Sequence, residues 1–147
     1  MTITIEKRPG WDDYFLAIAM LAATRSHDND TKHGCVIVDA KHRQVGMGYN
    51  GYPRGCGEEQ FPDTRPAKYD YIIHAELNAI LNCERRPDGA TVYVTGCPCP
   101  HCMLAMIQAG IVRVVYGTVQ SASVDCDKMR ASMLLACACG VALEARG

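Results

Sequence analysis

The stretch ATVYVTGCPCPHCMLAMIQAGIVRVVYG (90–117) decides the fold, because it reads as a strand, a helix and a second strand in direct succession. β-Branched residues dominate 90–96 and 111–117, whereas the apolar residues between about Cys99 and Ala109 have helical spacing. Strands that alternate with helices are typical of a layered sheet covered on both faces. We therefore predict an α/β fold, a three-layer α/β/α sandwich.

The flanking segments extend this pattern. The polar segment from 51 to about 70 contains Gly and Pro and is predicted to be a loop. The other segments predict a first helix over Trp11–Thr24, a hairpin of GCVIVDA (34–40) and RQVGMGYN (43–50), helices from about Ala75 to Cys83 and from about Asp125 to Cys139, and a short final strand VALEA (141–145). Together the strands form a central mixed sheet of about five strands.

Length and composition indicate one domain over residues 1–147. The chain is 48% hydrophobic and 21% charged, and a chain of this length can bury a core without a structural metal. The net charge is −1, and no stretch is strongly basic, so we expect no partner among long nucleic acids. A small substrate with few phosphates remains open.

The sequence also predicts a cytoplasmic protein with no membrane partner. No apolar run approaches the roughly 18 residues of a membrane span, and MTITIEKRPGW (1–11) lacks the apolar stretch and cleavage site of a signal peptide. The nine cysteines are therefore expected to stay reduced. Cys35, Cys83, Cys137 and Cys139 lie in apolar segments, where buried free thiols are ordinary.

Cysteines cluster in GCPCPHC (96–102), where a strand ends and a helix begins. The spacing Cys99-x-x-Cys102 lets two sulfurs reach one metal ion, and the positive end of the helix dipole favours the thiolate form that binds zinc. IIHAELNAI (72–80) leads into the previous helix, so His74 could join the two cysteines at the same edge of the sheet. The three ligands would leave one zinc position open for water.

Glu76 follows His74 by two residues and so points to a different side of the helix start, where a carboxylate can accept the proton of that water. An alternative reading is a closed structural zinc site, completed by Cys97 or His101. It leaves Glu76 without a role.

His74-Ala75-Glu76 followed by Pro98-Cys99-x-x-Cys102 matches the H-x-E…P-C-x-x-C signature of the zinc-dependent deaminases. The chain resembles the cytidine and deoxycytidylate deaminase family, and within it the deoxycytidylate (dCMP) deaminases, from about Trp11 to Val141. Four segments carry the resemblance: RSHD (25–28) with the following GCVIVD, GYNGYPRGC (48–56), KYDYIIHAELNAI (68–80) and CPCPHCMLAMIQAGI (97–111).

The resemblance implies a cytidine deaminase-like fold and hydrolytic deamination of dCMP to dUMP and ammonia, which supplies dUMP for thymidylate synthesis. It implies one catalytic Zn²⁺ per subunit, with Glu76 as the catalytic proton carrier. Asn50 would contact the sugar or base, and Arg25 the phosphate. Ala75 and Tyr71 are further candidates for substrate contact.

Regulation and assembly follow from the same resemblance. Many family members are homohexamers that dCTP activates and dTTP inhibits, with Gly48, Tyr49, Asn50 and Gly51 in the implicated region. We therefore expect a homo-oligomer, a hexamer by resemblance, with nucleotide effectors that could carry Mg²⁺.

Two features depart from the family pattern. Some bacterial relatives bind a second zinc through Cys and His residues in the loop before the H-A-E motif, and EEQFPDTRPAKYDY (58–71) has neither. His33 stands where relatives often have an apolar residue. Three rival functions stay open: a deaminase of both dCMP and dCTP, with Lys32 near the phosphates; a nucleic-acid base deaminase; and a zinc-stabilised binding module.

Overall fold

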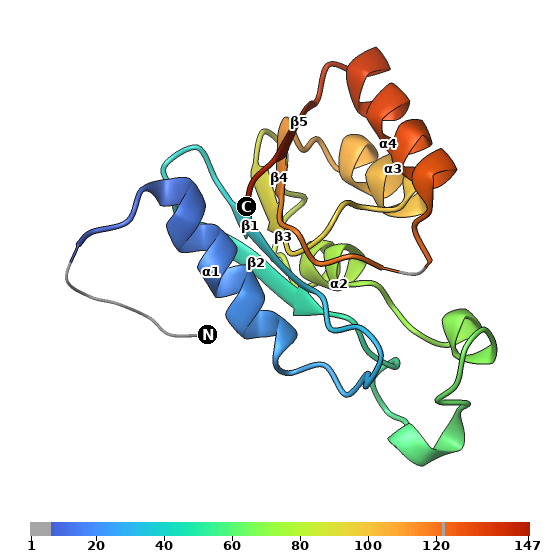
Figure 1. Ribbon diagram of the computed structural model, residues 1–147. Helices are drawn as coiled ribbons and strands as arrows, with labels where there is room; N and C mark the ends of the chain where they lie inside the picture. The colour runs from blue at the N-terminus through green and yellow to red at the C-terminus, as the bar shows by residue number, and fades with distance from the viewer. Residues whose placement is uncertain (1–6, 122) are drawn as a thin grey trace.

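A computed structural model describes residues 7–121 and 123–147 of the chain (Figure 1). Residues 1–6, part of the segment inspected above for a signal peptide, lie outside the described residues. The elements are α1 (Trp11–Ala23), β1 (Gly34–Val38), β2 (Gln44–Tyr49), the 3-10 helices η1 (Glu58–Gln60) and η2 (Ala67–Asp70), α2 (Ala75–Leu81), β3 (Thr91–Val94), α3 (Pro100–Gln108), β4 (Arg113–Tyr116), α4 (Cys126–Ala138) and β5 (Ala142–Ala145). Their order is the predicted one.

The five strands form one mixed sheet in the order β2-β1-β3-β4-β5. β1 pairs antiparallel with β2 and with β3, whereas β3, β4 and β5 run parallel to one another. Both parallel connections pass through a helix, α3 between β3 and β4 and α4 between β4 and β5, as parallel strands require. The predicted mixed sheet of about five strands is confirmed.

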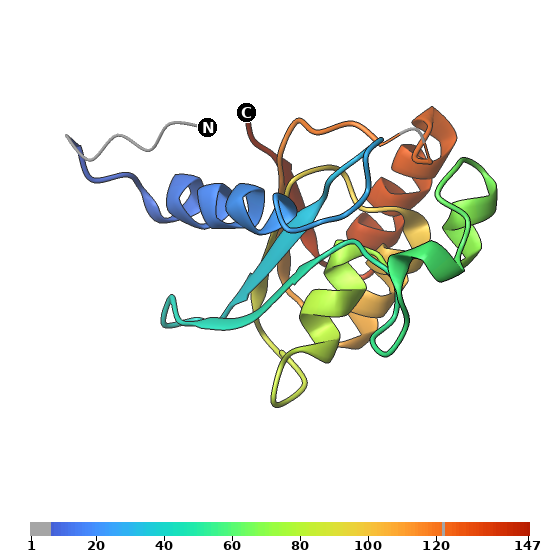
Figure 2. The same ribbon diagram turned by 90° about the horizontal axis from the view of Figure 1, so that it is seen from below.

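Helix α1 covers one face of the sheet, and α2, α3 and α4 cover the other (Figure 2). Alternate residues of each strand point to opposite faces, so the strands contribute to two apolar clusters. The cluster under α1 contains Phe15, Ala19, Val36, Val38, Tyr93 and Val115. The larger cluster under α2 and α3 includes Ile37, Ala79, Val92, Val94, Met103, Met106 and Val114. This arrangement confirms the three-layer sandwich.

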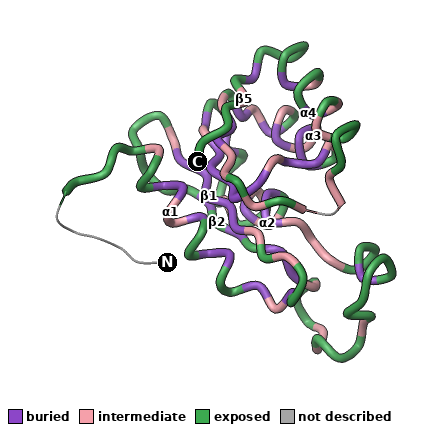
Figure 3. The backbone as a smooth tube through the Cα atoms, viewed as in Figure 1, coloured by how far each residue is buried: buried purple, intermediate pink, exposed green. Residues whose placement is uncertain are grey.

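The segment between β2 and α2 extends away from the sheet (Figure 1) and is mostly exposed (Figure 3). It was predicted to be a loop, and it contains the two short 3-10 helices η1 and η2. Its ends meet where the backbones of Gly51 and Ile73 exchange two hydrogen bonds of 3.1 and 2.8 Å. Lys68 lies far out along this segment, yet its side chain is buried.

Some expectations about burial are wrong. Cys137 and Cys139 are exposed, because α4 lies at the outside of the helical layer and turns these thiols to its surface. The apolar residues with helical spacing on α3 are not all in the core: Met103 and Met106 are fully buried, whereas Leu104 is 49% exposed. Among the described residues, no helix is long and apolar enough to cross a membrane.

Candidate functional site

Three side chains with metal-binding atoms meet at the starts of α2 and α3. His74 is the N-cap of α2, Cys99 is the N-cap of α3, and Cys102 lies in the first turn of α3. The Nδ1 atom of His74 lies 3.5 Å from the Sγ atom of Cys99 and 3.3 Å from that of Cys102. All three donor atoms lie within 4.8 Å of one another, so one ion could contact all of them. The predicted juxtaposition is confirmed.

The local sequence explains why these side chains face one another. Cys99 has extended backbone angles, and its Sγ atom accepts a hydrogen bond of 3.5 Å from the backbone N–H of Cys102. Pro100 starts the helix, where a missing N–H costs nothing. Both cysteines and the histidine therefore sit at helix N-termini, where the dipole stabilises negative charge.

The electrostatics of the cluster favour one thiolate. Hydrogen bonds from Cys102 and then from His74 lower the pKa of the Cys99 thiol to about 3, against the effect of burial. The hydrogen bond between the two thiols raises the pKa of Cys102. The hydrogen bond between His74 and Cys99 raises the pKa of His74. A nitrogen and two sulfurs form a donor set that suits zinc, with three protein ligands as in catalytic zinc sites.

Glu76 lies beside this cluster in the first turn of α2 and is only 6% exposed. Burial is the largest cause that raises the pKa of its carboxyl, while the neighbouring Cys102 and His74 act in the opposite direction. A raised pKa makes a carboxylate a stronger proton acceptor, which suits a group that carries protons. Glu76 and its neighbour Ala75 both line the pocket at the cluster.

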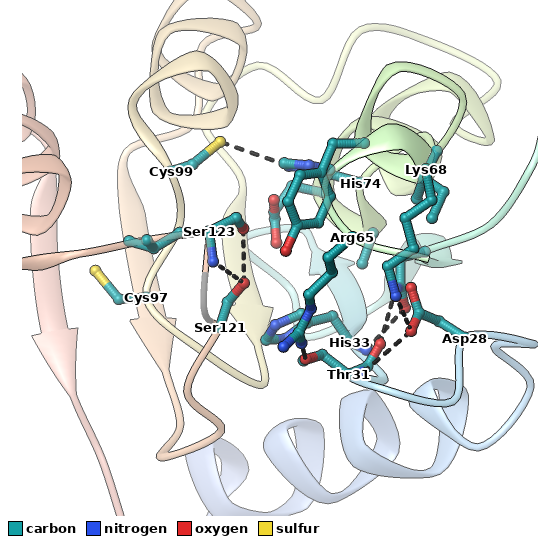
Figure 4. Close-up of a pocket in the computed structure, with 16 residues that line it drawn as sticks. Asp28, Thr31, His33, Arg65, Lys68, His74, Cys97, Cys99, Ser121 and Ser123 are labelled. Atoms are coloured by element: carbon teal, nitrogen blue, oxygen red, sulfur yellow. Dashed lines mark hydrogen bonds and ion pairs between the residues drawn. The ribbon is translucent and has the colours of Figure 1, made fainter. Parts of the chain in front are cut away.

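The pocket runs from the metal-binding cluster toward the segment before β1 (Figure 4). The pocket is partly open to solvent, and the space not filled by atoms, adjoining open solvent included, is about 610 Å³. The walls come from the segment before β1, the residue after β2, the loop before α2, the starts of α2 and α3, and the segment after β4. The lining residues from outside the helix starts include Asp28, Thr31, His33, Asn50, Arg65, Lys68, Tyr69, Ser121, Ser123 and Val124. A small polar molecule could therefore reach the cluster.

Asn50 is in the pocket wall and is 7% exposed. Its Oδ1 atom accepts a hydrogen bond of 2.8 Å from the backbone N–H of His33, and its Nδ2 atom donates one of 3.0 Å to the carbonyl of Thr31. Asn50 thus fixes the backbone of Thr31 and His33, which also line the pocket. One N–H of the amide has no partner in these bonds and could face a bound molecule.

Two other predicted contact residues lie outside the pocket wall. Arg25 is exposed, and its guanidinium lies 6.0 Å from the centroid of the Tyr49 ring. Tyr71 is 42% exposed and stacks on Phe61 with ring centroids 4.9 Å apart. The structure therefore does not place Arg25 or Tyr71 beside Glu76.

The glycines of the predicted effector region have structural partners. Gly48 lies in β2 directly beneath α2: an added Cβ would come within 2.5 Å of the backbone nitrogen of Ala79 and 2.7 Å of the carbonyl oxygen of Ala75. Gly51 pairs with Ile73 at the base of the loop. The close approach of the β2 and α2 backbones explains the glycine at position 48. The effector role of residues 48–51 stays a prediction.

Sequence reasoning missed the pocket roles of His33, Arg65 and Lys68. The Nδ1 atom of His33 shares a hydrogen bond of 2.9 Å with the Oγ1 atom of Thr95. His33 was noted only as a departure from the family pattern, and that departure was the available signal. Arg65 and Lys68 lie in a polar loop, where charged residues are ordinarily solvated.

The rival closed metal site gains no support from the described residues. His101 is exposed, and Cys97 is half-buried in the pocket wall but is not part of the three-residue cluster. Neither side chain therefore completes a fourth protein ligand within the described residues.

The chain is similar to known proteins in sequence and in fold. Residues 9–118 match the family model described as "Cytidine and deoxycytidylate deaminase zinc-binding region". The chain is 41% identical over 132 residues to the deoxycytidylate deaminase of Pongo abelii, covering 85% of this chain and 73% of the relative. It is 43% identical over 124 residues to the deoxycytidylate deaminase of Mycobacterium phage D29, covering 74% of this chain and 95% of that protein.

Among solved structures, the fold resembles that of a dCMP deaminase from the cyanophage S-TIM5 in complex with dCMP and dUMP. The TM-score is 0.73 at 26% identity, with 96% of this chain and all of that chain covered. The segment matched by the family model contains both helix starts, with His74, Glu76, Cys99 and Cys102.

Proposed function

The chain belongs to the cytidine and deoxycytidylate deaminase family, and we propose that it catalyses the zinc-dependent hydrolytic deamination of dCMP to dUMP and ammonia. The observation that carries this proposal is the meeting of His74, Cys99 and Cys102 beside the buried carboxyl of Glu76 in one pocket. Deaminases named for dCMP align with most of the chain, which supports the nucleotide as substrate.

His74, Cys99 and Cys102 are proposed to hold the zinc ion. Their distances and the lowered pKa of Cys99 support this assignment, because zinc binds thiolate sulfur and neutral imidazole nitrogen. When bound, zinc supplies an open position for water and lowers the pKa of that water to about 7. Cys97 and His101 are not part of the proposed ligand set.

Glu76 is proposed to move the protons of the reaction. Its carboxylate accepts a proton from the attacking water, delivers it to ring N3, and then transfers a proton from the added hydroxyl to the departing amine. One C4–O bond forms and the C4–N4 bond breaks, so that water and dCMP give dUMP and ammonia. The burial that raises the pKa of Glu76 supports this role, because a carboxylate with a raised pKa is a stronger proton acceptor.

Asn50 and Ala75 are proposed to orient the nucleotide. Both line the pocket, and Asn50 is held rigidly by its bonds to His33 and Thr31. A fixed amide restricts the sugar or base to one orientation, which places C4 at the metal end. The roles of Arg25 and Tyr71 stay predictions, as do the effectors, Mg²⁺ and the hexamer.

Product analysis tests the function directly. The zinc-loaded protein is incubated separately with dCMP, dCTP and deoxycytidine, with and without the other nucleotides as effectors, and the products are separated by chromatography. We expect conversion of dCMP to dUMP. Comparable conversion of dCTP would establish the dual-substrate alternative, and no conversion of any of the three by folded, zinc-loaded protein would contradict the proposal.

A further inference from the structure

Arg65 is a pocket residue whose hydrogen-bonding capacity is largely unused. Its Nη2 atom donates a hydrogen bond of 3.0 Å to the Oγ1 atom of Thr31. Its Nε atom forms an ion pair with the Oδ2 atom of Asp30 at 3.7 Å, a distance too long for a hydrogen bond. The guanidinium carries five N–H donors in a planar fork, and the bond to Thr31 is its one hydrogen bond among residues 7–121 and 123–147.

Lys68 also lines the pocket, but two aspartates already neutralise its positive charge. Its side chain is 3% exposed, and its Nζ atom donates hydrogen bonds of 2.9 Å to Asp28 and 2.5 Å to Asp30. Asp30 is 43% exposed and lies between the two cations. Arg65 is therefore the group of this pair that can take a new anionic partner.

The position of Arg65 fits the far end of a bound nucleotide. Figure 4 shows its side chain extending toward Thr31, away from Cys99. The cytosine C4 atom must lie near Glu76 and the metal-binding cluster for deamination, so the deoxyribose and its phosphate must lead away from them. We propose that Arg65 binds the 5′-phosphate and makes the pocket select a nucleoside monophosphate over the free nucleoside and the triphosphate.

This inference rests on the proposed function, and charge explains the selection. A free nucleoside leaves the fork of Arg65 without an anion. A triphosphate brings two further phosphates next to the exposed carboxylate of Asp30, which repels them. Arg25 and Lys32 do not line the pocket, and the Nζ atom of Lys32 instead donates a hydrogen bond to the carbonyl of Ser26.

The test compares substrates that differ only in phosphate number. In R65Q, kcat/KM for dCMP is expected to fall about 10- to 100-fold, because a charge-assisted hydrogen bond to phosphate is lost. The value for deoxycytidine is expected to fall far less, so the preference for the monophosphate collapses. R65K keeps the charge without the fork and is expected to recover part of the loss.

Arg54 is an exposed arginine of the same loop that does not line the pocket, so R54Q is a matched control. R54Q is expected to keep the preference for dCMP. An equal fall for dCMP and deoxycytidine in R65Q would indicate a merely structural role and overturn the proposal. A loss of dCMP preference in R25Q but not in R65Q would assign the phosphate to Arg25 and overturn it as well.

Binding separates this proposal from the proposed function. Calorimetry of the zinc-loaded protein with dUMP and with deoxyuridine measures the contribution of the phosphate without turnover. A parent protein that converts no substrate contradicts the proposed deaminase activity. Arg65 is then judged by binding alone: loss of the dUMP preference in R65Q supports its role, and an unchanged preference overturns it.

Discussion

The Nζ atom of Lys68 lies 2.9 Å from the Oδ1 atom of Asp28, and both side chains are almost fully buried although 40 positions separate them in sequence. Burial alone would lower the pKa of Lys68, but its hydrogen bonds to Asp30 and Asp28 outweigh that effect and raise it. Asp28 also accepts hydrogen bonds from the backbone N–H groups of Asp30 and Thr31. This ion pair therefore joins the exposed loop to the opposite pocket wall.

Replacing the lysine should destabilise the protein. K68M removes the cation and leaves Asp28 buried without its partner, so we expect the free energy of unfolding to fall by about 3 kcal/mol. Urea denaturation monitored by circular dichroism measures the change. K41M, at the exposed turn between β1 and β2, is the control and is expected to change it by less than about 0.5 kcal/mol. Equal stability of K68M and the parent would contradict the structural role.

A methyl group at Gly48 should displace the helix that carries Ala75 and Glu76. The added Cβ of G48A would overlap the backbone of Ala79 and Ala75, which is expected to cost about 1–3 kcal/mol of stability. Because small displacements of catalytic groups are expensive, we also expect dCMP turnover to fall about 10-fold or more. Denaturation and initial rates check both effects. G10A, where an added Cβ meets nothing within 4 Å, should leave both close to the parent values.

Glu76 can be replaced without changing the shape of its buried site. E76Q removes the proton carrier, so kcat for dCMP is expected to fall by about 10²- to 10⁴-fold. Zinc content and thermal unfolding should remain close to those of the parent, since the amide has nearly the same volume. Substantial turnover by folded, zinc-containing E76Q would remove Glu76 from the mechanism and favour the binding-module alternative.

Metal removal distinguishes the three proposed ligands from their neighbours. Chelation is expected to abolish dCMP deamination, and zinc is expected to restore it. H74A, C99S and C102S should each lower the zinc content from about one ion per chain toward zero, because three ligands hold the ion. C97S and H101A are the controls and should retain it. Loss of zinc in either control, measured by elemental analysis, would revive the closed four-ligand site.

Acid should weaken the contact between α1 and the sheet. Asp12 bonds to Arg113 at 2.9 and 2.8 Å and to the Tyr93 hydroxyl at 2.7 Å. The bond to Arg113 is the largest cause that lowers the pKa of Asp12 from 3.8 to about 2. The folded state therefore binds this proton less tightly than the unfolded state, so the stabilisation is complete above about pH 5 and is lost as the pH falls through 2.

The variant D12N tests that contribution. It should be less stable than the parent at pH 7 by about 1–3 kcal/mol and should lose less stability between pH 5 and pH 2. Urea denaturation at several pH values measures both quantities. D70N, at an exposed aspartate of η2, should follow the parent profile. Identical pH profiles for D12N and the parent would show that Asp12 does not contribute.

The sequence was sufficient to predict the order of elements, since helical and strand periodicities are local properties. It also predicted that His74, Cys99 and Cys102 would meet beside Glu76, because each of these residues stands at a helix start. The strands are shorter than expected. For example, β3 ends at Val94, because Gly96 and Pro98 follow closely and turn the chain.

Local sequence patterns could not predict pocket residues whose positions depend on contacts with distant parts of the chain. Lys68 reads as a solvated lysine in a polar loop, and only the folded chain brings it to Asp28. Arg25 was chosen by resemblance for the phosphate, whereas the guanidinium that reaches the pocket belongs to Arg65. Local spacing contains no information about which side of a long loop folds back over the site.

The groups proposed for chemistry and those that surround the far end of the pocket come from separate parts of the chain. The former are held at the starts of α2 and α3, on the rigid sheet, whereas Arg65 and Lys68 belong to the segment between Gly51 and Ile73, whose ends are joined by two backbone hydrogen bonds. This segment is therefore a module that can be exchanged, provided that the replacement keeps a cation for the buried carboxylate of Asp28. Grafting a different loop between these two residues offers a way to change which nucleotides are accepted while leaving the bond-breaking machinery in place.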